Sequence, residues 1–259
     1  MLKVLKERFK QGKCTIAYPA GDAPPLPNRF RGYPAIDRSK CPDNCRACID
    51  ACPVGAVSFV VSSALSCNDK TIQIDLGKCL FCTECTDACT GKAISFTKNH
   101  ELSKHKRENL ILKAGETMNV ETGLDKKIKK LFGRSLKLRQ VSAGGCNGCE
   151  ADINVLSTIV YDLGRFGIQF VASPRHADGL LITGPVTENM KLALEKTYAA
   201  VPSPKLVIAA GACAISGGPY IGHCQANNGA DSIVPVDLYI PGCPPHPLTT
   251  LHGLLMLKK

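Results

Sequence analysis

Apolar and polar positions follow different patterns in the two halves of the chain. From Leu136 onward, short aliphatic runs alternate with longer segments of helical periodicity. The runs predict strands at residues 136–141, 168–172, 179–183, 205–210 and 234–240. The longer segments predict a helix of about 14 residues that ends at Asp162, a second near 187–200 and a third that follows Pro245. Residues 136–259 are therefore expected to form an α/β domain with a parallel, flavodoxin-like sheet.

The first half contains shorter apolar runs that are arranged around a repeat between residues 39 and 97. The β-prone runs 56–61 and 93–96 each follow a cysteine-rich loop, and Ile72–Ile74 precedes the second loop. Each unit of the repeat predicts a loop, a short helix and a strand. The expected product is a small α+β domain made of two related units.

An amphipathic segment and a proline-rich arm precede the repeat, within residues 1–38. Leu2, Leu5 and Phe9 share one face of a helix predicted over residues 1–12, and basic side chains surround them. This helix either packs on its own domain or docks on a membrane surface or a partner subunit. The arm that follows it, residues 13–38, lacks a periodic pattern and is expected to wrap the domain.

A basic linker is predicted over residues 98–135, between the repeat and the α/β domain. It contains a second amphipathic helix, whose apolar face consists of Leu124, Ile128, Leu131 and Phe132. This face either caps a core of the chain or docks on a partner or a membrane-facing surface.

Eight cysteines lie inside the repeat, in two runs of four. In the C-x2-C-x2-C-x3-C spacing of 4Fe–4S proteins, three consecutive thiolates hold one cluster and the fourth holds the other. We therefore predict two 4Fe–4S clusters, one on Cys41, Cys45, Cys48 and Cys89, the other on Cys79, Cys82, Cys85 and Cys52. Zinc needs only four ligands per site and does not account for two complete sets.

Composition limits the function further. Fifteen cysteines without a secretory signal favour a reducing compartment and metal binding over disulfides. No apolar run approaches the roughly 18 residues of a membrane span, so a soluble protein is expected. The formal charge of +10 overstates that of the metal-loaded protein, because each oxidised cluster with its thiolates carries about −2. Without Trp or a binding motif, nucleic-acid binding is disfavoured.

Four more cysteines follow the predicted strands of the α/β domain. In a parallel α/β sheet, ligands gather at the carboxyl ends of the strands. The four cysteines are expected there, in loops rich in glycine and proline that bring the backbone close to a ligand: Cys146, Cys149, Cys213 and Cys243. Inert packing of buried thiols is the alternative. We predict a third 4Fe–4S cluster on these residues.

Several motifs carry a family resemblance over nearly the whole chain. Gly145-Cys-Asn-Gly-Cys149-Glu150, 173–178, 211–214 and Pro241-Gly-Cys-Pro-Pro245 resemble the small subunit of energy-converting, group 4 NiFe hydrogenases and the homologous complex I subunit. Residues 1–100 look like the two-cluster ferredoxin subunit of the same complexes. The chain thus resembles a fusion of two neighbouring electron-transfer subunits, as in formate hydrogenlyase.

The chain also departs from these patterns. Three residues rather than two separate Cys41 from Cys45, with Cys67 as the nearest substitute ligand, and Thr90 replaces the usual proline after Cys89. Ala212 stands where Asp is common, and His246 follows the proline pair where Arg is common. None of these changes removes a predicted ligand. The Cys-x-x-Cys pair at 146 and 149 favours the hydrogenase relatives, since complex I subunits carry adjacent cysteines.

The resemblance implies roles for two more residues. Glu150 would conduct protons or orient a partner beside the third cluster, although an acidic residue is also favoured at a helix N-terminus for its own sake. Arg175 would donate a hydrogen bond towards the third cluster, or else form a salt bridge at a strand end. Cys14, Cys67 and Cys224 remain as packing or loop thiols. No nucleophile–base constellation is present, so this chain alone is not expected to be catalytic.

The function expected from the resemblance is electron transfer within a membrane-associated oxidoreductase complex. Three clusters would connect a soluble ferredoxin or a formate dehydrogenase module to a NiFe large subunit, beside membrane-embedded antiporter-like subunits. Partner subunits would attach the protein to the cytoplasmic face of the cell membrane. Two alternatives remain: a complex I-like quinone or sulfur reductase without nickel, and a free-standing ferredoxin-like carrier or redox sensor.

Overall fold

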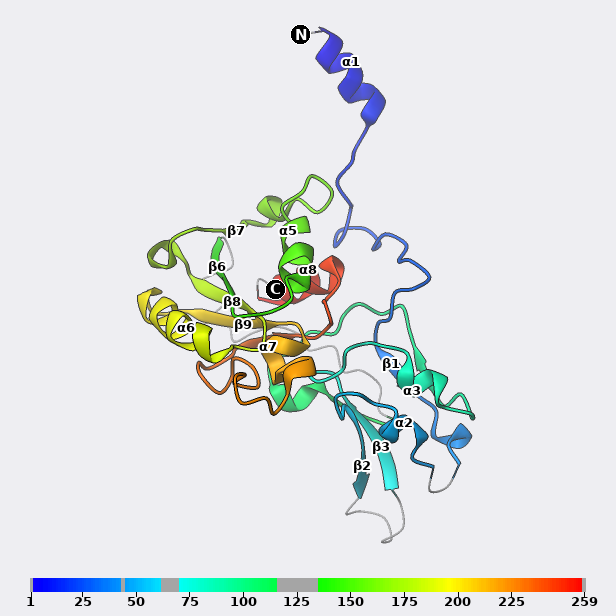
Figure 1. Cartoon of the computed structure of the whole chain (residues 1–259). Coiled ribbons are helices and arrows are strands. Elements are labelled where there is room, and N and C mark those ends of the chain that lie inside the picture. The colour runs from blue at the N-terminus through cyan, green and yellow to red at the C-terminus, as the bar shows by residue number, and fades with distance from the viewer. Residues whose placement is uncertain (1, 43–44, 62–69, 116–134, 258–259) are drawn as a thin grey trace.

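The computed structural model describes residues 2–42, 45–61, 70–115 and 135–257. The predicted helix around Leu124–Phe132 and the thiol of Cys67 lie outside the described residues. Figure 1 shows an α/β half, a smaller half that carries the cysteine repeat, and an N-terminal helix that projects from both.

Five parallel strands form the sheet of the α/β half, in the order β10-β9-β8-β6-β7. They are β6 (Leu136–Ser142), β7 (Ile168–Phe170), β8 (Gly179–Thr183), β9 (Leu206–Ala210) and β10 (Leu238–Ile240). Counted along the chain this is the order 2-1-3-4-5, in which the connections reverse direction between β6 and β8. The predicted parallel, flavodoxin-like sheet is confirmed.

Both faces of this sheet are covered. Leu181 of β8 packs with α5 (Gly148–Val155) and α8 (Pro247–Met256), whereas its neighbours Leu180 and Ile182 pack with α6 (Glu188–Ala200). Side chains alternate across a strand, so these two clusters are the two faces of the sheet. A fully apolar strand such as β8 is what burial on both faces requires.

Helix α5 is shorter than predicted. It ends at Val155, and the chain continues in turns through Thr158, whose hydroxyl donates to the carbonyl oxygen of Val155 at 2.7 Å. A threonine that bonds the backbone nearby offers the chain an alternative to further helix. The prediction of a helix reaching Asp162 is therefore wrong.

Two antiparallel sheets make up the smaller half. β1 (Pro34–Ile36) pairs with β4 (Ile94–Phe96), and β3 (Lys70–Asp75) lies between β2 (Val57–Val61) and β5 (Ile111–Lys113). Each cysteine run contributes one short helix, α2 (Ala47–Asp50) or α3 (Glu84–Asp87). β5 falls in the segment predicted as a linker. This strand could not be predicted, because it has three residues and only Leu112 is buried, which is too few for an alternating pattern.

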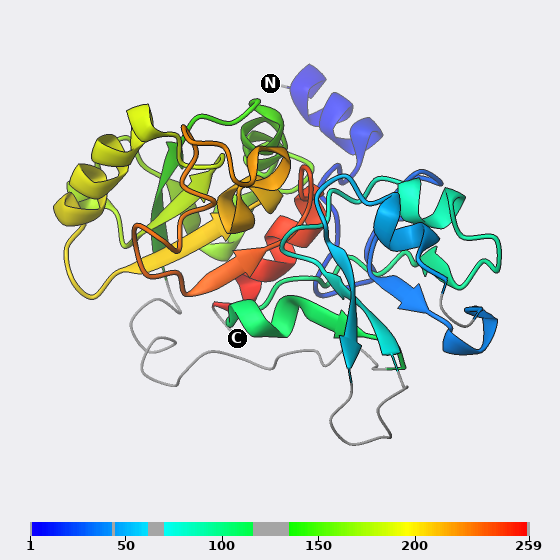
Figure 2. The same cartoon turned by 60° about the horizontal axis from the view of Figure 1, so that its bottom comes forward.

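The two halves share a core and hydrogen bonds. Ile72 and Ile74 of the smaller half lie in one apolar cluster with Ile215 of α7 (Ala212–Ser216) and with Tyr239. The backbones of Lys104 and Tyr239 donate to each other at 3.0 and 2.8 Å, which adds a bridge to the edge strand β10. Figure 2 shows the smaller half seated beside this edge.

The N-terminal segment consists of a helix and an arm, which differ in their contacts with the rest of the chain. Helix α1 (Leu2–Gln11) buries none of its residues, and it extends away from the body in Figure 1. The arm, residues 13–38, instead runs over both halves: Arg165 donates at 2.8 Å to the carbonyl oxygens of Ile16 and Tyr18. Short 3-10 turns complete the described fold at Arg38–Lys40, Arg107–Leu110, Leu163–Phe166, Pro174–His176 and Gly218–Tyr220.

Candidate metal centre

The repeat gathers its cysteines around the two short helices. Cys48 lies on α2 and Cys85 on α3, and both are buried. Each helix begins directly after a loop that carries a cysteine, so loop cysteines and helix cysteines lie close together in the chain. Equivalent cysteines thus take equivalent places in the two units.

Electrostatic coupling shows which thiols are neighbours. Burial raises the pKa of Cys48 to about 11, and repulsion from Cys41, Cys89 and Cys45 adds to it. These are the four cysteines predicted for the first cluster. The structure therefore brings this set together, including Cys89 from the other unit.

The second predicted set is grouped in the same way. Burial raises the pKa of Cys79 to about 12, with added repulsion from Cys85, Cys82 and Cys52. Cys52 comes from the first unit, so this set also contains thiols of both units.

Backbone amides point at sulfur in both units. Ala56 donates its N–H to Sγ of Cys52, and Ala93 donates to Sγ of Cys89, each at 3.2 Å. Phe81 donates to Sγ of Cys79 at 3.3 Å. Hydrogen bonds to ligand sulfurs stabilise negative charge there and are among the features that set cluster potentials.

The third set lies at the carboxyl edge of the parallel sheet. Cys146 and Cys149 follow β6, Cys213 lies on α7 after β9, and Cys243 follows β10. Burial raises the pKa of Cys149 well above its usual range, and repulsion from Cys213, Cys243 and Cys146 adds to this. The four thiols are thus neighbours, although three different strands deliver them.

Glycines leave room for these sulfurs. A Cβ on Gly211 would lie 2.6 Å from Sγ of Cys149, and one on Gly218 would lie 2.8 Å from Sγ of Cys213. Both glycines also have positive φ, at +92° and +55°, which side-chain-bearing residues rarely adopt. Only glycine fits at either position.

The second set neighbours both of the others. The pKa of Cys85 is raised by burial and by repulsion that includes Cys48 of the first set. The pKa of Cys243 is raised by burial and by repulsion that includes Cys82 of the second set. The second set is therefore the one that adjoins both the first and the third.

The donor set fits a multi-iron cluster. Each set consists of four thiols, and the described cysteines form no disulfide. Among the described residues, no three His, Cys, Asp or Glu side chains converge closely enough for a single ion. Four cysteine thiolates are the ligand type and the ligand number of one 4Fe–4S cluster, so each set supplies a complete donor set.

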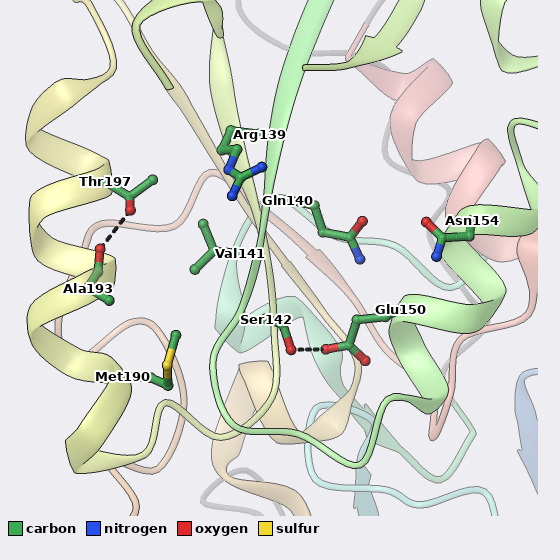
Figure 3. Close-up of a pocket in the computed structure, with 9 residues that line it drawn as sticks. All are labelled: Arg139, Gln140, Val141, Ser142, Glu150, Asn154, Met190, Ala193 and Thr197. Atoms are coloured by element: carbon green, nitrogen blue, oxygen red, sulfur yellow. Dashed lines mark hydrogen bonds between the residues drawn. The ribbon is translucent and has the colours of Figure 1, made fainter. Parts of the chain in front are cut away.

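Glu150 lies close enough to the third set to add to the repulsion that raises the pKa of Cys149 and Cys213, and its predicted role there remains a prediction. Its Oε1 accepts hydrogen bonds from the hydroxyls of Ser142 and Thr183, both at 2.6 Å. Burial acts to raise the pKa of Glu150, but these bonds outweigh it and hold the pKa below its usual value. Figure 3 shows Glu150 of α5 turned towards Ser142 of β6, beside a pocket of about 520 Å³.

Arg175 lies on an exposed turn, at Pro174–His176. Among the described residues, no hydrogen bond joins it to a cysteine of the third set. Its predicted role remains a prediction. Cys14 and Cys224, the described leftover thiols, are exposed.

Several residues of the site were missed by the sequence analysis. Arg31 donates to the carbonyl oxygen of Phe81, inside the loop between Cys79 and Cys82, at 3.0 Å. Ser142 and Thr183 fix Glu150. The signal for Arg31 was the presence of two arginines in a proline-rich arm that leads into a cluster loop. For Thr183, nothing in the sequence indicates a hydrogen bond with Glu150.

Comparison with known proteins identifies the α/β half. A family profile described as NADH ubiquinone oxidoreductase, 20 Kd subunit, matches residues 146–257. A probable membrane-bound hydrogenase subunit of Pyrococcus furiosus is 44% identical over 136 residues, which cover 51% of this chain and 81% of that protein. The chain belongs to the NADH ubiquinone oxidoreductase 20 Kd subunit family.

Other relatives are subunits of similar assemblies. Formate hydrogenlyase subunit 7 of Escherichia coli is 46% identical over 53% of this chain, which spans about half, 52%, of that protein's length. A chain from the structure of a membrane-bound sulfane sulfur reductase, an archaeal respiratory membrane complex, is 36% identical over 52% of this chain and 77% of its own, with a TM-score of 0.45.

In the part of this chain that the structure describes, no helix is long and apolar enough to span a membrane.

Proposed function

We propose that the chain is the electron-transfer subunit of a membrane-associated oxidoreductase complex and carries three 4Fe–4S clusters. The observation that carries this proposal is the presence of three four-thiol sets in one chain, of which the second adjoins the other two. The proposed ligands are Cys41, Cys45, Cys48 and Cys89 for the first cluster, Cys79, Cys82, Cys85 and Cys52 for the second, and Cys146, Cys149, Cys213 and Cys243 for the third. The smaller half is proposed to be a two-cluster ferredoxin domain, fused to the family's α/β domain.

When bound, the clusters supply one-electron chemistry, and the protein provides the surroundings. Buried thiols such as Cys79 and Cys213, with pKa values raised to about 12 and about 11 by burial, hold their protons until metal displaces them. The apolar cluster shared by the halves buries Cys79 and Cys85 of the second set. The amides of Phe81, Ala56 and Ala93 stabilise charge on the sulfurs.

A NiFe hydrogenase is the complex that we propose. Two of the matched relatives are named as subunits of a membrane-bound hydrogenase and of formate hydrogenlyase, and the Cys146–Cys149 spacing follows the hydrogenase pattern. The third set would face a NiFe large subunit, and the first set would receive or deliver electrons at a ferredoxin or a formate-oxidising partner. Membrane-embedded antiporter-like subunits would complete the assembly. This chain itself would break no substrate bond.

A complex I-like reductase without nickel is the second candidate. The family that contains this chain is named for NADH ubiquinone oxidoreductase, which favours this candidate directly. The same line of clusters would serve a quinone or sulfur site in place of nickel. The two candidates differ only in the partner that the third set faces.

Helix α1 is proposed to attach the protein to the cytoplasmic face of the membrane, in addition to its partner subunits. Leu2 and Phe9 are 84% and 86% exposed, and Lys3, Lys6 and Arg8 accompany them. Apolar side chains on one face with basic ones around them match the interface of an anionic lipid bilayer.

Metal analysis of the native complex, purified through a tag on this chain, tests the function. About one nickel and at least about twelve iron per complex are expected for three clusters and a NiFe site. Iron at that level without nickel would leave the complex I-like candidate. Iron near eight would contradict the third cluster.

A further inference from the structure

A groove of about 450 Å³ lies where the second and third thiol sets approach each other. Both Cys82 and Cys243 line it, and so do residues 29–31 of the arm. The arm is remote from these cysteines in sequence, so its place in the groove is a feature of the fold. An electron that passes between the two sets must cross beside it.

Three hydrogen bonds hold this part of the arm in place. The ammonium group of Lys98 donates to the carbonyl oxygens of Pro27, Asn28 and Phe30, at 2.8, 2.7 and 2.9 Å. The ring of Phe30 meets the ring of His246 edge to face, with centroids 5.2 Å apart. Arg31 follows directly, and its direction is therefore set by both halves of the molecule.

Arg31 acts on the loop of the second set. Its guanidinium donates to the carbonyl oxygen of Phe81 at 3.0 Å, and the N–H of Phe81 donates to Sγ of Cys79 at 3.3 Å. Phe81 has a φ of +53°, in the left-handed region that such side chains avoid. Arg31 thus holds the loop in the conformation that aims an amide at a ligand sulfur.

Charge adds to this positioning. A 4Fe–4S cluster with its four thiolates becomes more negative on reduction, so a nearby cation stabilises the reduced form. Arg29 and Arg31 are the cations of the groove, and Asp152 is its carboxylate. Only Arg31 is fixed to a cluster loop by a hydrogen bond that the structure records.

We propose that Arg31, held beside the loop of the second set, raises the reduction potential of the second cluster through its charge and so sets the step between the second and third clusters. The inference rests on the proposed function. No bond forms or breaks in this step: one electron leaves one cluster and enters the other. The arm therefore tunes the chain of clusters as well as joining the two halves.

Redox titration of the purified complex, followed by electron paramagnetic resonance, tests the inference. Arg31→Gln keeps a donor for Phe81 but removes the charge. The substitution should lower the equilibrium constant for one-electron reduction of the second cluster about tenfold. This corresponds to a fall of about 59 mV in its reduction potential. Arg31→Lys keeps the charge and should restore most of the potential. Lys196→Gln, at an exposed position of helix α6, is the matched loss of one positive charge and should change no cluster potential.

The first cluster serves as an internal reference, since none of its proposed ligands lines the groove that holds Arg31. An unchanged second-cluster potential in Arg31→Gln, with about twelve irons retained, overturns the inference and leaves the proposed function intact. Equal shifts of all three clusters also overturn it. A native complex with iron near eight contradicts the proposed function itself, whatever the Arg31 variants show.

Discussion

Ser216 donates its hydroxyl to the carbonyl oxygen of Gly77 at 2.9 Å, across the junction of the two halves. Both groups are in the interior, and Gly77 directly precedes the loop of the second set. Beside them, Arg107 forms two bonds of 2.7 Å with the carboxylate of Asp75. The junction is therefore packed and polar at the same point, so the halves are fixed where electrons are proposed to pass.

Gly77→Ala should destabilise this junction. The added Cβ would lie 2.7 Å from Cζ of Arg107 and 2.8 Å from Cγ2 of Ile215, so both neighbours must shift. Overpacking of this kind costs about 1–3 kcal/mol. Urea unfolding of the purified protein measures it. Gly164→Ala is the control, because its nearest contact is an ordinary 3.8 Å; equal stability of the two variants would contradict the prediction.

Local spacing explains why so much of the site could be predicted. The ligands of the first two sets are close in the chain, and the third set follows three strands whose parallel order fixes a common edge. Hydrophobic runs placed all five parallel strands, because a strand buried on both faces is apolar throughout.

Tertiary contacts explain what could not be predicted. Nothing local links Arg31 to Phe81 or Lys98 to the carbonyl of Pro27, since each pair is far apart in sequence. β5 has three residues and only Leu112 inside, too few for a periodic signal. The hydrogen-bond donors of Glu150 could not be predicted either, because Ser142 and Thr183 come from two adjacent strands.

Cys213→Ala should remove one cluster and leave two. Its thiol is buried among the third set, so its loss opens that set alone. Iron per chain should fall from about twelve to about eight, and the remaining paramagnetic signals should be unchanged. Cys224→Ala removes an exposed thiol outside the sets and should leave iron unaltered. Iron near twelve in Cys213→Ala would exclude this ligand.

Acid should weaken the interface around His100. Burial lowers the pKa of His100, although Glu101 acts in the opposite direction, and Tyr18 and His252 pack around its ring. A histidine whose folded pKa is lowered takes up protons more readily when unfolded. Its contribution to stability is therefore complete above the unfolded pKa of about 6.5 and declines as the pH falls below it.

The melting temperature of the complex between pH 7.5 and 5 measures this effect. One such group accounts for at most about 1.4 kcal/mol per pH unit. His100→Gln, which does not titrate, should show a shallower decline than the native protein. His176→Gln, on an exposed turn, is the control and should follow the native curve. Identical slopes for all three proteins would rule out His100.

Phe9→Glu should weaken attachment to lipid without affecting the clusters. Phe9 is 86% exposed on α1, and none of the helix residues is buried, so the fold does not depend on this ring. Binding to vesicles of phosphatidylcholine with phosphatidylglycerol should weaken on the order of tenfold or more, because a large apolar side chain is lost from the bilayer interface. Phe9→Leu keeps an apolar group and should bind nearly as well. Added salt should weaken the native interaction, since Lys3, Lys6 and Arg8 contribute through charge. Equal vesicle binding by Phe9→Glu and the native protein, at equal iron content, would show that α1 contacts a partner subunit and not the lipid.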